Sequence, residues 1–254
     1  MSGREKFLAR HTTASLHTLL GGKRAVVALV PIGSTEPHGP HLALGTDVVI
    51  SAAACLRATE LLDKKGALVG VIAPAVSYGV TECAAGFPGA VSVPGEVLTA
   101  YVAAICDGLL AQGMRHVCLV NNHLEPAHDT AIRGALAGRE GKVSVACPLT
   151  KKWARTLSAE FKSGACHAGQ YETSIMMAAA PEMVDEAMRN VLAPVPISLS
   201  TQLAAGVGTF SAMGMELAYA GNPAGATVEE GEQQIQRLAE MVVGEIREAL
   251  GLPG

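Results

Sequence analysis

Apolar runs alternate with amphipathic segments along this chain, and the two patterns predict different elements. Four runs rich in Val, Leu, Ile and Ala have the nearly continuous hydrophobicity of strands that are buried on both faces. They cover residues 25–30, 68–73, 115–120 and 143–146. Helices are predicted between them, over residues 48–62, 96–110 and about 127–136. This alternation predicts a three-layer α/β/α fold with a mostly parallel central sheet.

The last part of the chain predicts one long helix and an irregular stretch before it. Residues 228–250 carry apolar side chains at the spacing of one helix face. An earlier helix is expected to begin near Ala168 and to continue through the apolar residues 175–180. Residues 190–228 are rich in Pro, Gly and Ser, and we expect a subunit contact or a pocket wall there. No repeat or linker divides the sequence, so residues 1–254 are expected to form a single domain.

Composition narrows the class of protein. The 254 residues are 49% hydrophobic but only 4% aromatic, which predicts a large aliphatic core. The net charge of −4 and the isoelectric point near 6.1 offer no basic surface for nucleic acid. The N-terminus lacks the apolar stretch of a signal peptide, and no run reaches the roughly 18 apolar residues of a membrane span. Six cysteines without CxxC spacing indicate no disulfide framework, so we expect a cytoplasmic protein.

The strongest chemical signal follows the first predicted strand. Glu36, His38 and Asp47 offer the carboxylate and imidazole ligands that divalent metals favour. Gly33 and Pro37 are among the residues that prevent a regular helix or strand here. Because open α/β sheets place their ligands at the carboxyl ends of strands, this loop predicts a metal site. The alternative interpretation is a solvated surface turn.

A second cluster follows the third predicted strand. In an extended segment His123 and Glu125 project to the same side, because side chains alternate with a period of two. Both can therefore reach one site above the sheet edge. Asn121 and Asn122 can simply end the strand. His128 is expected inside the next helix as a surface or packing residue.

A third cluster contains His167 and Glu172. If a helix begins near Ala168, Glu172 faces inward from its first turn, beside Thr173 and Ser174. His167 then stands at the helix entrance, where a histidine can carry protons. In the alternative, Glu172 only complements the helix dipole and His167 belongs to a capping loop.

Together the three clusters resemble the creatininase (creatinine amidohydrolase) family. The matching segments are Pro31–Leu42, Gly45–Asp47, Asn122–Glu125, and His167–Gly169 with Glu172–Ser174. Tyr78-Gly79 and Phe87–Gly89 also resemble landmarks of the family. The resemblance extends from about residue 25 to about residue 180 and implies the family's α/β fold.

The resemblance implies a centre of two divalent metal ions, which would be zinc, manganese or iron. Glu36 and His123 would bind one ion, His38 and Glu125 the other, and Asp47 would bridge them. Such a pair of ions lowers the pKa of a shared water and polarises the carbonyl of the bond to be cleaved.

The resemblance also implies three catalytic residues. His167 matches the family's catalytic histidine and would pass a proton to the leaving nitrogen. Glu172 would be a ligand, a general base or a group that orients a ligand histidine. Many relatives have Gly in place of Glu125, so acids at both positions resemble the creatininase branch.

Several residues depart from the family pattern. Cys83 stands where His is frequent, Ala90 where Thr is frequent, and Pro126 where Asn is usual. The tryptophan expected on a mobile segment before the catalytic histidine is absent, and the only tryptophan, Trp153, would be a pocket wall or core residue. These departures concern the substrate and leave the metal chemistry intact.

The sequence therefore predicts a metal-dependent amidohydrolase of a small-molecule cyclic amide, with creatinine or a related lactam as the leading substrate. Alternatives within the family are a formamide deformylase and a peptidase that trims a peptide-derived cofactor precursor. A non-catalytic module that binds a metal or ligand is the alternative of another class, and the presence of His167 argues against it. Because the family is typically oligomeric and often hexameric, we expect a homo-oligomer.

Overall fold

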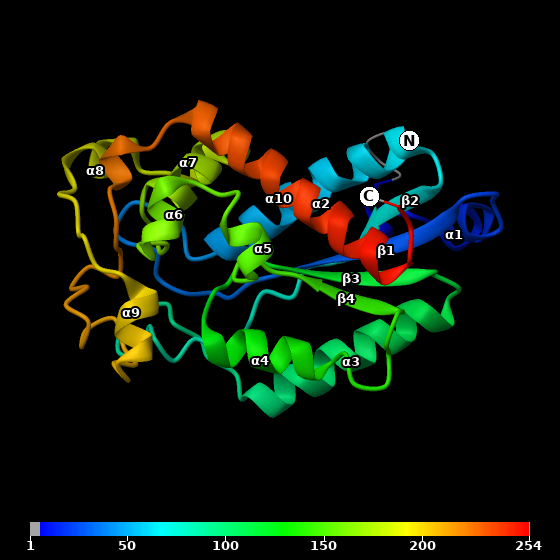
Figure 1. The fold of residues 1–254 in the computed structure, drawn as a ribbon, viewed down its shortest axis with the longest axis horizontal. Helices are drawn as coiled ribbons and strands as arrows, with labels where there is room; N and C mark the ends of the chain where they lie inside the picture. The colour runs from blue at the N-terminus through cyan, green and yellow to red at the C-terminus, as the bar shows by residue number, and fades with distance from the viewer. Residues whose placement is uncertain (1–5, 254) are drawn as a thin grey trace.

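A parallel sheet between two layers of helices forms the centre of the molecule (Figure 1). The computed structural model describes residues 6–253. Its four described strands lie in the order β2 (Leu68–Ile72), β1 (Ala25–Ile32), β3 (His116–Asn121) and β4 (Val143–Ala146). The predicted three-layer α/β fold with a parallel sheet is confirmed.

Alternate residues of β1 enter two different hydrophobic cores, one on each face of the sheet. Val27 and Leu29 pack with one core, while Ala28 and Val30 pack with the other. The first face is covered by α2 (Thr46–Lys65) and α10 (Val228–Ala249), and the second by α3 (Gly95–Ala111) and α4 (Pro126–Gly134). Burial on both faces explains why the strand sequences are almost continuously apolar.

The long helices occur where periodicity predicts them, with local differences at their ends. Gly66 ends α2 in a left-handed conformation, with φ of 78°, which costs glycine little. The helix expected near Ala168 begins two residues later, as α7 (Gln170–Ala179). Short helices were not predicted: α1 (Thr13–Leu20), α5 (Lys151–Ala154), α6 (Ala159–Ser163), α8 (Glu186–Val191), α9 (Leu199–Ala204), and the 3-10 turns Leu8–Arg10, Pro181–Met183 and Pro223–Gly225.

The order of the strands creates a crevice between β1 and β3. The chain passes from β1 to β2 on one side and then crosses to β3 on the other side of β1. At such a switch point the loops at the carboxyl ends of the two central strands diverge, which leaves space for a ligand. Helices α6 to α9 gather at one end of the molecule, at the left in Figure 1. Among the described residues, no helix is long and apolar enough to cross a membrane.

The buried His116 at the start of β3 provides a test of the pH dependence of folding. Its Nε2 lies 2.8 Å from Ser144 Oγ, and burial lowers the pKa of the imidazole to about 4. The unfolded chain takes up this proton near pH 6.5, so stability is lost as the pH falls from 6.5 towards 4. We expect the stability difference between the wild type and His116→Gln to change by about 1.4 kcal/mol per pH unit in that window. Urea unfolding of both proteins at several pH values measures it, and parallel profiles would contradict the assignment.

Candidate active site

The loop after β1 brings Glu36 and Asp47 together. Gly33 makes this approach possible, because a Cβ at this position would lie 2.5 Å from the Cβ of Asp47. The backbone N–H of Ser34 then donates to Asp47 Oδ2 at 3.1 Å. Asp47 lies in the first turn of α2, where the helix dipole favours a carboxylate. Both acids are buried, at 1% exposure each.

His38 directs a bare ring nitrogen at these acids. Its Nδ1 lies 3.1 Å from the Glu36 carbonyl oxygen, which can only accept, so Nδ1 carries the hydrogen in the neutral ring. Its Nε2 faces Asp47 Oδ1 at 3.1 Å and Glu172 Oε2 at 3.7 Å. The imidazole therefore offers a lone pair to the same place as two carboxylates.

His123 repeats this arrangement from the loop after β3. Its Nε2 donates to the Val80 carbonyl at 2.7 Å, which leaves Nδ1 facing Asp47 Oδ2 at 3.0 Å and Glu36 Oε1 at 3.2 Å. Asn121 holds the His123 backbone from both sides, since its amide nitrogen donates to the carbonyl and its amide oxygen accepts from the N–H. Asn121 thus does more than end the strand.

The buried carboxylates of this cluster favour positive charge on the neighbouring groups, because they raise the pKa of both His38 and His123. Burial alone would lower the pKa of His38, but Asp47, Glu172 and Glu36 raise it to about 10. Burial also opposes protonation of His123, yet Glu36 and Asp47 raise its pKa well above the usual value. In the metal-free chain these imidazoles hold protons between the carboxylates. A divalent cation can replace those protons, because every inward-facing atom is a good metal ligand.

Three groups of side chains in the described chain bring ligand atoms within 4.8 Å of one another. They are Glu36–Asp47–His123, His38–Asp47–Glu172 and Glu36–His38–His167. Asp47 is shared by the first two groups. These side chains therefore offer candidate ligands for metal ions.

Glu125 is the one predicted ligand that lies outside these groups. Its Oε1 accepts from the Glu82 N–H at 3.0 Å and its Oε2 accepts from the Cys83 N–H at 3.1 Å. Burial raises the pKa of this carboxyl. In the group around His38, the acid is Glu172 instead.

Glu172 is held in place by a strained backbone next to His167. Ala168 has φ of 50°, an uncommon conformation for a residue with a Cβ, and its N–H donates to Glu172 Oε2 at 2.7 Å. Burial raises the pKa of Glu172 to about 8, against the opposing effect of His38. The backbone conformation at Ala168 therefore places Glu172 and His167 in the same site.

His167 is held in place through one ring nitrogen and leaves the other ring nitrogen free. Its Nε2 donates to the Pro37 carbonyl at 3.0 Å, so Nδ1 is the free nitrogen, 3.8 Å from Glu36 Oε1. The ring lies between those of His38 and Phe210, with centroid distances of 4.5 Å and 4.4 Å. Burial and the neighbouring His38 lower the pKa of His167 to about 4. The ring is therefore neutral near pH 7 and can accept a proton.

The loop between β2 and α3 supplies two further residues next to the cluster, of which only Cys83 stands out in the sequence, as a departure from the family pattern. Thr81 donates its hydroxyl to Glu36 Oε2, and Cys83 lines the cavity. His128 is fully buried on α4, so it is not a surface residue. No local pattern marks these positions, because their partners come from other loops.

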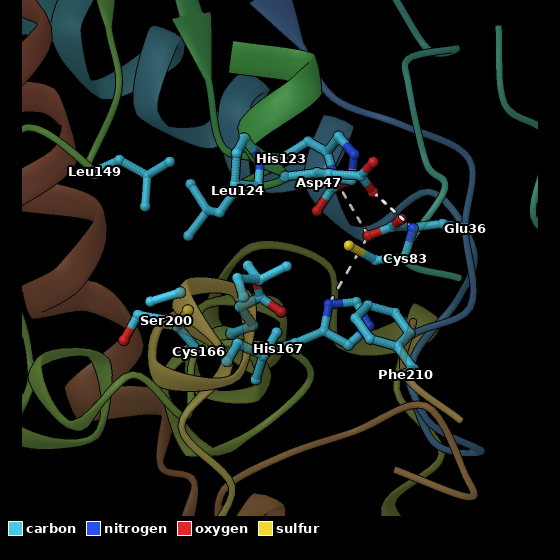
Figure 2. Close-up of a pocket in the computed structure, with 16 residues that line it drawn as sticks. Glu36, Asp47, Cys83, His123, Leu124, Leu149, Cys166, His167, Ser200 and Phe210 are labelled. Carbon is cyan, nitrogen blue, oxygen red and sulfur yellow. Dashed lines mark hydrogen bonds and ion pairs between the residues drawn. The ribbon is translucent and has the colours of Figure 1, made fainter. Parts of the chain in front are cut away.

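A cavity of about 420 Å³ opens next to the cluster (Figure 2). Glu36, Asp47, His123 and His167 converge at one end, Leu124 lies beside His123, and Leu149 lies away from the cluster. The apolar wall consists of Leu124, Pro126, Leu149, Leu199, Leu203, Ala204 and Phe210. Its lining includes Cys166 and Ser200 but no described Lys or Arg.

Two structural expectations about the walls are resolved by this cavity. The Pro-, Gly- and Ser-rich stretch contributes α9 to the lining, in accordance with one of its two predicted roles. Trp153 is not among the lining residues. It is partly buried against the core and packs on Gly244 of α10, where its indole N–H donates to Glu245 at 2.5 Å.

The fold and the cluster define an α/β protein with a buried carboxylate–histidine site of the kind that metal-dependent hydrolases use. The chain belongs to the creatininase family and is a hydrolase of that family: the family described as Creatinine amidohydrolase matches residues 10–246. The resemblance seen in the sequence is thereby confirmed.

Two curated relatives differ in what they act on. The mycofactocin precursor peptide peptidase of Mycolicibacterium smegmatis (strain ATCC 700084 / mc(2)155) is 30% identical over 239 residues, which are 93% of this chain and 87% of the relative. The creatinine amidohydrolase of Pseudomonas putida is 30% identical over 178 residues, which are 63% of this chain and 66% of the relative.

Solved creatininases share the fold. A variant creatininase of Zn-Zn type superimposes with a TM-score of 0.69 at 23% identity, covering 97% of this chain and 98% of that chain. A manganese creatininase gives a TM-score of 0.65 at 24% identity, with coverage of 97% and 99%.

Proposed function

We propose that this protein is a two-metal amidohydrolase that cleaves an amide bond in a peptide or peptide-derived compound, next to an apolar side chain. The observation that carries this proposal is the apolar wall that continues directly from the carboxylate–histidine cluster. A cavity of about 420 Å³ is in the range that accommodates drug-sized ligands. The similarity to a peptidase of a peptide precursor supports the same substrate class.

Creatinine or a related lactam is the second candidate. The relative from Pseudomonas putida favours it, as does the retention of acids at both position 125 and position 172. Creatinine is a single small polar ring, however, and would leave the side chains of Leu149, Leu199 and Leu203 without a partner. The apolar wall therefore supports the proposal of a peptide-derived substrate over the lactam.

Asp47 would be shared by two cations, with Glu36 and His123 on one side and His38 and Glu172 on the other. Zinc and manganese are the first choices, because solved creatininases contain them, and iron would suit the same ligands. The cations would supply Lewis acidity and make water more acidic.

The chain itself would contribute orientation and proton transfer to the reaction. His167 Nδ1 is free and borders the cavity, where it can take up a proton and return it to the leaving nitrogen. The apolar wall excludes water and holds the side chain of the substrate, which fixes the amide relative to His167.

The substrate class can be tested with a panel of N-acylated dipeptides, formyl amides, lactams and creatinine. We expect the highest kcat/KM for dipeptides with Leu or Phe beside the cleaved bond, at roughly 100-fold above the Gly equivalent. Leu203→Asp is expected to remove that preference. Leu217→Asp is the matched control, because Leu217 is 53% exposed and does not line the cavity.

Other outcomes assign the function differently. Faster turnover of creatinine than of any peptide would establish the lactam hydrolase. Deformylation alone would establish the formamide deformylase. Binding of metal without turnover of any of these amides would favour a non-catalytic module.

A further inference from the structure

His128 is a buried histidine that neither the metal ligands nor the proton transfer accounts for. It lies in the first half of α4, and its side chain is fully buried. Gly79 allows the ring to approach the neighbouring loop, because a Cβ at that position would lie 2.3 Å from His128 Nδ1. Such a close approach between distant parts of the chain requires a glycine here.

The hydrogen bond of His128 defines which ring nitrogen carries its proton. The Val80 N–H donates to His128 Nδ1 at 3.2 Å, so Nδ1 is an acceptor. The hydrogen of the neutral His128 ring therefore lies on Nε2. Its Nε2 has no hydrogen-bond partner within the described part of the chain.

Val80 connects His128 to the metal ligand His123. While the Val80 N–H bonds to His128, its carbonyl accepts from His123 Nε2 at 2.7 Å. The two rings also pack edge to face, with centroids 4.5 Å apart and planes at 75°. His128 thus constrains both the position of the Val80 carbonyl and the ring of His123.

Among the described residues, the loop that contains Val80 also forms hydrogen bonds to Glu36 and Glu125, but not to His38 or Glu172. Thr81 donates to Glu36, and the N–H groups of Glu82 and Cys83 donate to Glu125. The group around His38 is anchored elsewhere, since His38 bonds to the Glu36 carbonyl and Glu172 accepts from Ala168. A shift of the loop is therefore expected to disturb one cation position more than the other.

We propose that His128 is a positioning residue that holds Val80 so that His123 keeps its hydrogen on Nε2 and directs Nδ1 at Glu36 and Asp47. By this route His128 sets the cation affinity of the Glu36–Asp47–His123 group. The inference rests on the proposed two-metal function. Partners that orient ligand histidines in this way typically change metal affinity by 10- to 100-fold.

The test compares substitutions that keep or move the acceptor. His128→Asn places its amide oxygen near the position of Nδ1 and can still accept from Val80. His128→Gln carries its amide at the level of Nε2, and His128→Leu carries none. Titration of the metal-free proteins with Zn²⁺ against a chromophoric chelator gives the affinity of each of the two ions. We expect a 10- to 100-fold loss for one ion in the Gln and Leu variants, with His128→Asn within about threefold of the wild type.

His116→Gln is the control for loss of a buried histidine, because His116 lies at the opposite end of β3. It should unfold more readily without any change in the two Zn²⁺ affinities. Equal affinities in all His128 variants, or equal loss of both ions, would overturn the positioning role. A wild-type protein that binds no Zn²⁺ would instead overturn the proposed function itself, so the two failures are distinguishable.

Discussion

Replacing His167 with alanine is expected to lower kcat by roughly 10²- to 10⁴-fold while both cations stay bound. The reason is that His167 is neutral near pH 7, bonds to the Pro37 carbonyl through Nε2, and leaves Nδ1 free beside the cavity. Under the proposed function, its loss removes the group that would pass protons to the leaving nitrogen. Turnover of the best substrate from the amide panel, together with metal content per chain, measures both parts of the expectation.

The metal content separates two roles for this histidine. His167 also belongs to one of the three groups of possible ligands, with Glu36 and His38. Loss of an ion in the alanine variant would make His167 a ligand, whereas retained turnover would remove it from proton transfer. His116→Gln again serves as the control for loss of a buried histidine and should turn over substrate normally.

If the proposed pair of cations is present, Glu172→Gln is expected to release one of them, while Glu125→Gln keeps both. The first substitution removes the carboxylate that faces His38 Nε2 at 3.7 Å. We expect the affinity for that ion to fall by more than the roughly 100-fold that results from losing an outer partner. In Glu125→Gln, the amide nitrogen replaces one of the oxygens that accept from Glu82 and Cys83.

That second substitution should therefore act on stability. One backbone N–H loses its acceptor, which costs about 1–3 kcal/mol when the group is buried. Elemental analysis after dialysis and urea unfolding of the metal-free variants distinguish the two acids. If Glu125→Gln loses an ion and Glu172→Gln does not, then Glu125 is the ligand, as the sequence resemblance implies.

The sheet and its helices were predictable because their sequences record burial directly. Each strand is buried along nearly its whole length, so it appears as a continuous apolar run. Helix α1 could not be predicted in this way, since none of its residues is buried. Helices α5 and α9 have only four and six residues, which is too short for a helical period to show.

The site was predictable to the level of residue types and loops but not of individual contacts. A period of two correctly placed His123 and Glu125 beside one cavity. The carboxylate of Glu125, however, is directed by N–H groups that lie 42 and 43 residues away in the sequence. His128 is similarly defined by a bond to Val80 across 48 residues. Contacts between loops of this separation leave no periodic trace in a sequence.

The placement of α9 has a consequence for how this enzyme family diversifies. The candidate cation ligands and His167 lie in the loops after β1 and β3 and at the entrance of α7, whereas Leu199 and Leu203 belong to a separate segment outside the sheet. Under the proposed function, mutations in that segment can alter which amide is accepted without displacing any atom that takes part in bond cleavage. Selection for a new substrate can therefore proceed through intermediates that remain catalytically competent.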